Sequence, residues 1–419
     1  MYIKDNFSSL FMKYAHFADL HLGSWREDKM RQLSMNAFLT AIDECINEKV
    51  DFILFSGDMF NTSLPSLDTL KVVTKKMKDL SDMGIPIYAI AGSHDFSPSG
   101  KTMLDVLENA GLLVNVCKGK VDSESRKLFL RFTIDTKTGV RITGIVGRKG
   151  MLDRTYYENL DLENLENEKG YKIFLFHTAL TELKPKHLEF MEAYPATFLP
   201  KGFDYYAGGH VHHPARVDIE NYGPMTYPGA LFPNNFAELE KYSKGGYYLV
   251  TVDDEGRQEI AWCPVEVMKH RSLVLDCIHK TPEIVLFEVL NAFNNQDLSD
   301  TLITLRLIGT LEKGRVADID FKQIFEKLSL QGSYFVMKNT AKLNSEEFEE
   351  IKINPSNPDN LEEEVISEHL QQSHLFDATR ERELIRLLLG ALNTSKREGE
   401  TITDFQLRIE TEMNRLLHL

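Results

Sequence analysis

Five short apolar segments of this chain each end in side chains that can bind a metal ion, and this repeated arrangement restricts the fold more than any other feature. The segments are "YAHFADLH", "DFILFSGD", "IPIYAIAGSHD", "YKIFLFH" and "FDYYAGGHVH". Stretches with helical spacing of apolar residues follow several of them, at 26–48, 67–83 and 102–109. Such alternation predicts an α/β fold with a largely parallel, buried sheet and helices outside. Because ligands lie at the carboxyl ends of strands in such sheets, we expect the five ends to converge on one edge.

The candidate site residues stand at these five ends. Spaced two apart on an extended backbone, His210 and His212 are expected to point the same way. Gly208 and Gly209 lack the Cβ atoms that would crowd a nearby centre. His16, inside the first segment, is predicted to be structural, and His213 to have a neighbouring or solvent role. The candidates, in chain order, are Asp19, His21, Asp58, Ser93, His94, Asp95, His177, His210 and His212.

The mixture of aspartate and histidine indicates the metal and the reaction. It suits Mn²⁺, Fe²⁺ or Zn²⁺ better than Ca²⁺. The set exceeds the needs of one ion, whereas two ions roughly 3.5–4 Å apart could share a carboxylate and clamp both oxygens of a phosphoryl displacement. We expect Asp58 to be the bridge. His94, whose ring Asp95 could orient, is expected to donate a proton to the leaving oxygen or to stabilise the transition state.

The ordered set of motifs resembles the calcineurin-like metallophosphoesterase superfamily. More narrowly, "FADLHLG", "GDMF", "AGSHDFSPSG", "FHT" and "GGHVHHP" resemble the SbcD-type DNA double-strand-break repair nucleases, the meiotic recombination eleven family, over residues 12–265. The resemblance implies a sandwich of two mixed sheets flanked by helices, followed by a small α/β capping domain and C-terminal helices. It implies two Mn²⁺ ions per subunit, with Mg, Fe or Zn as alternatives, and His94 as the catalytic histidine. One ion would be held by Asp19, His21, Asp58 and His212, and the other by Asp58, Ser93, His177 and His210.

Two positions depart from the pattern of that family. Ser93 stands where the family has an asparagine, and its hydroxyl is a shorter and poorer neutral ligand than an amide oxygen. Asn61 occupies a place where some members carry a histidine linked to exonuclease action. The polarity of cleavage is therefore less well indicated than metal binding.

Composition shifts, together with the functions that the resemblance implies, divide the chain into five predicted parts. Residues 1–11 are predicted to be an N-terminal extension, because Met12 begins a strand-like segment. Residues 12–267 form the nuclease domain, in which the short strands of 222–267 are expected to complete a second sheet. Residues 268–340 form the small capping domain, and 341–379 an acidic linker. Residues 380–419 form a helical partner-binding region, with apolar stripes in 384–392 and 405–417 and with Thr403 and Asp404 as N-capping residues.

Charge, apolar runs and cysteines restrict location and ligands. The net charge is −15, whereas proteins that bind nucleic acid alone are usually basic, so contact with DNA needs a local basic groove or a partner. There is no apolar run of the ~20 residues that a membrane helix needs, and no secretory signal. The four cysteines form no CxxC pair, which favours the reducing cytoplasm.

Three functions fit the site, and the rest of the chain ranks them. The leading prediction is an Mn²⁺-dependent nuclease acting on single-stranded DNA and double-stranded ends. By the resemblance, it binds an SbcC-type ABC ATPase through the C-terminal helices and forms a homodimer through 26–48 and 67–83. The alternative is a small-molecule phosphoesterase, either a nucleotidase or a cyclic-nucleotide phosphodiesterase. The acidic charge favours the alternative, while the extra domain and helices favour the nuclease. A metal-free scaffold is a third option, against which the intact ligands argue.

Overall fold

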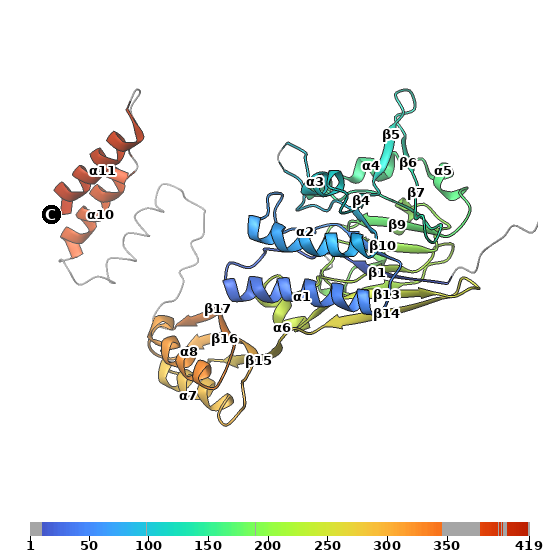
Figure 1. Cartoon of the computed structure of the whole chain (residues 1–419). Coiled ribbons are helices and arrows are strands. Elements are labelled where there is room, and N and C mark those ends of the chain that lie inside the picture. The colour runs from blue at the N-terminus through green and yellow to red at the C-terminus, as the bar shows by residue number, and fades with distance from the viewer. Residues whose placement is uncertain are drawn as a thin grey trace, which may run out of the picture. The chain divides into compact units, whose positions relative to one another are not determined.

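The computed structural model describes residues 11–345 except 98 and 189, and residues 378–417 except 393, 395 and 397–399. The chain divides into two compact units, Met1–Glu347 and Phe348–Leu419 (Figure 1). The predicted N-terminal extension (1–11) and acidic linker (341–379) fall almost entirely outside the described residues. Within the described residues, none of the helices combines the length and apolar character needed to cross a bilayer.

A mixed sheet of six strands holds the first three of the predicted strands. Its order is β14-β13-β1-β2-β3-β4. The strands from β1 to β4 run parallel, and β13 lies antiparallel to β1. The strand bounds are β1 Met12–Phe17, β2 Phe52–Ser56, β3 Ile87–Ile90, β4 Val114–Asn115, β13 Gly245–Val252 and β14 Gln258–Val265.

The other two predicted strands lie in a second mixed sheet. Its order is β11-β12-β10-β9-β8-β7, with the four central strands parallel. The five strand ends therefore come from two sheets and not from one, and the resemblance-based expectation of two mixed sheets is confirmed. The bounds are β7 Thr133–Ile134, β8 Arg141–Gly144, β9 Lys172–His177, β10 Tyr205–Gly209, β11 Ala215–Val217 and β12 Met225–Tyr227, and a separate hairpin joins β5 Lys118–Val121 to β6 Leu128–Arg131.

Alternation of apolar residues along the strands builds the layers. In β1, Tyr14 faces a core between the two sheets, while Ala15 and Phe17 face the helices on the other side. Helices α1 and α2 cover that outer face (Figure 1). The helix bounds in this unit are α1 Asp28–Asn47, α2 Leu67–Asp82, α3 Met103–Asn109, α4 Arg154–Glu158, α5 Leu162–Glu166 and α6 Phe236–Tyr242, with short 3₁₀ turns at Lys149–Met151, Thr181–Leu183, Lys186–Leu188, Ala196–Phe198 and Val316–Asp318.

A small parallel sheet with two helices follows the sandwich. Its strands are β15 Lys269–Asp276, β16 Thr301–Leu311 and β17 Phe335–Ser345, and its helices are α7 Pro282–Ala292 and α8 Phe321–Leu330. Strand β17 continues past residue 340, so the small sheet extends five residues into the segment expected to be a linker. Arg306 of β16 donates from Nε to Glu240 of α6 at 2.8 Å. This pair joins the small sheet to the helix that connects β12 to β13 of the sandwich.

The strands of 222–267 are arranged differently from our expectation. Only β12 joins the second sheet, whereas β13 and β14 extend the first one beside β1. β13 is "GGYYLVTV", and the burial of both its faces against helices and sheet explains why its sequence shows no alternation.

The second unit contains two helices in the segment where helices were predicted. They are α10 Ala378–Leu392 and α11 Ile402–Leu417, and they contact each other. Thr401, and not Thr403 or Asp404, caps α11, because its hydroxyl accepts from the backbone of Asp404 at 3.1 Å. Leu387, Leu392 and Leu407 stay at least half exposed.

Substitution of Gly209 tests how tightly β10 packs against β2. A Cβ there would lie 2.1 Å from the Ser56 carbonyl oxygen and 2.7 Å from Nδ1 of His177. We expect Gly209→Ala to destabilise the sheet unit by roughly 1–3 kcal/mol, because a backbone oxygen cannot move aside cheaply. Urea unfolding measures this. Gly390→Ala, whose Cβ meets nothing within 4 Å, is the control, and equal unfolding midpoints for the two variants would contradict the packing.

Candidate metal centre

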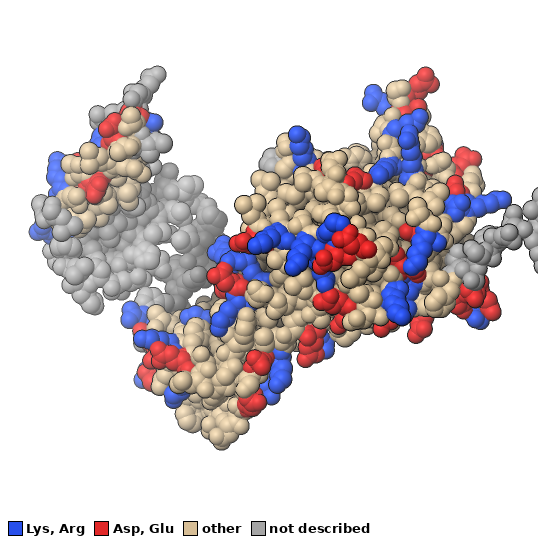
Figure 2. Space-filling model, in the orientation of Figure 1, with Lys and Arg blue, Asp and Glu red and all other residues tan. Residues whose placement is uncertain are grey.

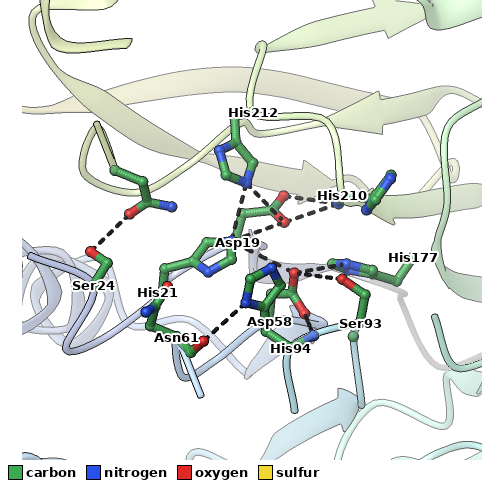
Figure 3. Close-up of polar contacts among 12 residues, drawn as sticks. Asp19, His21, Ser24, Asp58, Asn61, Ser93, His94, His177, His210 and His212 are labelled. Carbon is green, nitrogen blue, oxygen red and sulfur yellow. Dashed lines mark hydrogen bonds and ion pairs between the residues drawn. The ribbon is translucent and has the colours of Figure 1, made fainter. Parts of the chain in front are cut away.

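The candidate residues meet where the strand ends of the two sheets face each other (Figure 3). Four of them leave their strands in the left-handed region, with φ of 52° at Asp19, 41° at His21, 51° at Asp58 and 88° at His210. This region is unfavourable for residues other than glycine, and such strain is found at functional sites. Backbone bonds hold it in place, since Asp19 donates to the Gly57 carbonyl at 3.2 Å. The strand ends are thus fixed by the backbone.

The Asp58 carboxylate lies at the centre of the group. Its Oδ1 accepts from the backbone of His94 at 2.7 Å, and its Oδ2 accepts from the Ser93 hydroxyl at 3.3 Å. The same Oδ2 is 3.2 Å from Nε2 of His177 and 3.6 Å from Nε2 of His21. Asp58 therefore contacts residues from both sheets, as a bridging ligand must.

Asp19 organises the other half of the centre. Its Oδ1 lies 3.7 Å from Nε2 of His212 and 3.9 Å from Nε2 of His21. The two imidazole nitrogens of His21 and His212 are 3.1 Å apart. The backbone of His210 donates to both Asp19 oxygens at 3.0 Å. Asp19, His21 and His212 thus form one compact group.

Three histidines are oriented by a hydrogen bond from Nδ1. His177 donates to the Ser56 carbonyl at 2.7 Å, and His94 donates to the Asn61 carbonyl at 2.9 Å. His212 donates to Oε1 of Glu238 at 3.0 Å. With Nδ1 engaged in this way, each Nε2 is free to face the centre. Such partners fix the tautomer of metal-binding histidines.

Glu238 belongs to the centre and was not found from the sequence. It lies on α6, whose N-cap Asn235 accepts from the backbone of Glu238 at 3.0 Å. Its second oxygen accepts from the backbone of Asn234 at 2.9 Å. The sequence signal was the Asn-x-x-Glu pattern at 235–238, which is typical of a helix start. That pattern does not indicate a contact with His212.

Asp95 does not orient the ring of His94, contrary to our expectation. It is buried, and its carboxylate accepts from the backbone of Gly92 at 2.8 Å and of Asp58 at 3.0 Å. Burial, together with the charge of Asp58, raises the pKa of Asp95 to about 7. The role of Asp95 is to fix the two loops, and the Asn61 carbonyl orients His94 instead.

The remaining predictions on individual residues have mixed outcomes. His210 lies past the end of β10 with a positive φ, so spacing on an extended strand does not explain its orientation; its ring packs 5.3 Å from that of His177. His16 is structural, as predicted, because its Nδ1 lies 3.0 Å from the Tyr205 hydroxyl in the core. His213 packs against the ring of Tyr242 at 5.6 Å. The glycines make room for other parts of the chain, since a Cβ at Gly208 would lie 2.5 Å from Phe176.

The donor atoms fit cations. In the described residues, three groups of ligand atoms lie within 4.8 Å of one another. Because His177 donates from Nδ1, its Nε2 lone pair faces the Asp58 carboxylate, an arrangement that needs a proton or a metal ion between the two. Burial lowers the pKa of His177, but the charge of Asp58 outweighs burial and raises it to about 10. The three groups of ligand atoms that lie close together belong to Asp19, His21 and His212; to His21, Asp58 and His94; and to Asp19, Asp58 and His177.

Removal of Glu238 tests whether it supports the centre. We expect Glu238→Ala to weaken Mn²⁺ binding roughly 10- to 100-fold, because the ring of His212 loses the partner that orients it. Titration calorimetry with Mn²⁺ measures this. Glu240→Ala, on the same helix but paired with Arg306, is the matched control. Unchanged affinity in Glu238→Ala would show that His212 needs no carboxylate partner.

Several known proteins are similar to this chain. The family model described as calcineurin-like phosphoesterase matches residues 12–214. The DNA double-strand break repair protein Mre11 of Methanopyrus kandleri is 30% identical over 275 residues, which cover 63% of this chain and 59% of that protein. Mre11 of Methanococcus maripaludis is 29% identical, covering 57% and 62%. The metallophosphoesterase YhaO of Bacillus subtilis is 26% identical, covering 58% and 57%.

The chain spans about six tenths of the length of these curated relatives. A solved dimetal phosphatase from Danio rerio aligns with a TM-score of 0.40 at 9% identity, covering 61% of this chain and 96% of that chain, a likeness too weak to bear on function. The family match does include every side chain of the centre except Glu238. Residues 12–214 therefore match a calcineurin-like phosphoesterase domain.

Proposed function

We propose that this protein is an Mn²⁺-dependent nuclease that hydrolyses phosphodiester bonds in single-stranded DNA and at double-stranded DNA ends. The observation that carries the proposal is the Asp58 carboxylate, which contacts Ser93 and His94 on one side and lies beside His177 and His21 on the other. The similarity to proteins named for double-strand break repair supports DNA as the substrate.

The ligands divide into two sets that share Asp58. We assign Asp19, His21, Asp58 and His212 to one Mn²⁺, and Asp58, Ser93, His177 and His210 to the other. Bound there, the two ions would supply a nucleophilic hydroxide and neutralise charge on the phosphate. The chain holds the ligands in place through the Ser56 carbonyl behind His177 and through Glu238 behind His212.

His94 is assigned the role of proton donor to the leaving oxygen. Its Nδ1–H is held by the Asn61 carbonyl, so that Nε2 is directed to the centre. The main-chain carbonyl of residue 61 provides this contact, so it does not depend on the side chain at that position, where some family members carry a histidine. His94 also lies within ligand distance of His21 and Asp58, and its substitution separates the two roles.

Comparison of His94→Ala with Asp58→Ala tests these assignments. We expect His94→Ala to lower phosphodiester cleavage at least ~100-fold, the usual contribution of a general acid, with Mn²⁺ content unchanged. Asp58→Ala should lose both ions. Metal analysis beside Mn²⁺-dependent digestion of labelled DNA measures both effects, with His279→Ala, an exposed position, as control. Parallel loss of metal and activity in His94→Ala would make His94 a ligand.

The alternative, a small-molecule phosphoesterase, uses the same centre. The net charge of −15 favours it. On the face shown in Figure 2, basic and acidic side chains are interspersed over α1 and α2, and no large basic patch is present there. A panel of nucleotides and cyclic nucleotides assayed beside DNA distinguishes the two functions, because only the nuclease requires a polymer.

Two protein partners belong to the proposal. We propose a homodimer through α1 and α2, although Leu33 and Phe38 of α1 are buried in their own core and do not support it. Leu64, in the loop before α2, and Leu67, the first residue of α2, are 77% and 83% exposed and remain available for such a contact. We also keep the cytoplasm as the predicted compartment, since all four cysteines are free.

The second proposed partner is an SbcC-type ABC ATPase, which would bind the helices α10 and α11. These helices contact each other, yet Leu387, Leu392 and Leu407 remain 50%, 58% and 62% exposed. Amphipathic helices with exposed leucines commonly dock in a groove or on a coiled coil of a partner.

Removal of 378–419, starting where α10 begins, tests this partner. We expect the truncated chain to keep Mn²⁺-dependent cleavage of short single-stranded DNA but to lose the ATPase in a pull-down. Leu387→Glu with Leu407→Glu should reproduce the loss, because both side chains are exposed, while Glu410→Gln serves as the exposed control. Retention of the ATPase by the truncated chain at full affinity would refute the assignment.

A further inference from the structure

Arg148 is a half-buried arginine at the edge of the metal centre that the ligand assignments do not use. It follows β8, one residue after Gly147. A Cβ at Gly147 would lie 2.5 Å from Cδ2 of the His177 ring, so the backbone here is in contact with a candidate ligand. Gly147 also donates to the Ala91 carbonyl at 2.9 Å, just before the loop of Ser93 and His94. The main chain at Arg148 is therefore fixed against both motifs.

The side chain of Arg148 is held on the same side. Its guanidinium carbon lies 3.9 Å from the centroid of the Phe96 ring, two residues after His94. An arginine stacked on an aromatic ring is restricted in orientation and keeps its N–H groups available at the edge. Arg148 is thus placed beside the loop that carries Ser93 and His94.

Its hydrogen-bonding capacity is unused. Nε of Arg148 is buried without a partner in the described residues, where the guanidinium makes no hydrogen bond or ion pair. The neighbouring carboxylates are engaged elsewhere: Asp95, next to Phe96, accepts from backbone groups, and Asp153, five residues after Arg148, accepts from the Tyr194 hydroxyl at 3.3 Å. A buried donor left unpaired costs free energy, so a site of this kind indicates an absent acceptor.

Other unpaired arginines of the described residues do not share this environment. Arg26, Arg126, Arg131 and Arg271 also have no carboxylate partner, but all four are exposed to solvent. Water satisfies their donors. Arg148 alone among these five combines partial burial with a position beside the candidate ligands.

We propose that Arg148 is a phosphate-binding residue, whose guanidinium donates to a non-bridging oxygen of the substrate phosphate on the side of Ser93 and His177. Planar guanidinium groups match the geometry of phosphate oxygens, and such charge-assisted bonds are strong. The proposal deepens the nuclease function, on which its substrate class rests. It gives a predominantly acidic chain a fixed positive charge next to the reacting group.

Binding of inorganic phosphate to the Mn²⁺-loaded full chain tests this proposal without relying on cleavage. We expect Arg148→Met, which keeps an apolar stem against Phe96, to weaken phosphate binding roughly 10- to 100-fold with Mn²⁺ content unchanged. The phosphate affinity of Arg148→Lys should lie between those of Arg148→Met and the unaltered chain, because lysine keeps the positive charge but lacks the paired N–H donors of the guanidinium. Lys149→Met, the exposed neighbour, is the matched control and should bind phosphate as the unaltered chain does. Titration calorimetry and metal analysis provide the readouts.

The outcomes separate this inference from the proposed function. Unchanged phosphate affinity in Arg148→Met overturns it, and so does loss of Mn²⁺, which would make Arg148 a support of the ligands. If Arg148→Met fails to fold, Phe96→Leu replaces it, with an expected loss of roughly two- to fivefold from the missing stacking, and unchanged affinity there overturns the proposal. An unaltered chain that binds phosphate through Arg148 but cuts no DNA refutes the nuclease and leaves the inference standing.

Discussion

The centre depends on the contacts of one buried carboxylate, that of Asp58. Burial alone would raise its pKa, but the charges of His177 and His21 hold that pKa well below the ordinary value. A permanently charged group in the interior must be paired. Its partners come from three segments far apart in sequence, around His21, Ser93 and His177, and these segments belong to both sheets. The same requirement that stabilises Asp58 brings the candidate ligands together.

Much of this arrangement could be predicted, because parallel strands place their ends at one level. Phe17 pairs with Phe55 in β1 and β2, and Gly209 pairs with His177 in β10 and β9. Motifs that follow paired strands therefore lie side by side. The sequence could not indicate that these strands belong to two sheets, since apolar runs buried on both faces look alike in either sheet.

The contacts that orient the histidines could not be predicted. The Asn61 carbonyl orients His94, and because every residue has a main-chain carbonyl, the residue type does not indicate this contact. Glu238 orients His212 across 26 residues, and its sequence context indicates only a helix start. Arg148 has no motif at all and is recognised by its unpaired Nε and its contact with Phe96. Metal ligands can be predicted from residue type, whereas the groups that orient those ligands are found only from the geometry of the folded chain.

Helix α6 carries side chains that contact both the metal centre and the small sheet. Glu238 faces the centre, and both carboxylate oxygens of Glu240, two residues later, lie within hydrogen-bonding distance of Nε of Arg306 on β16, at 3.0 and 2.8 Å. The helix spans only Phe236–Tyr242, so the two glutamates lie on one short helix. A shift of the small sheet must then either break the pair of Glu240 and Arg306 or turn the helix that carries Glu238. The position of the small sheet and the orientation of the His212 ring are therefore linked through α6.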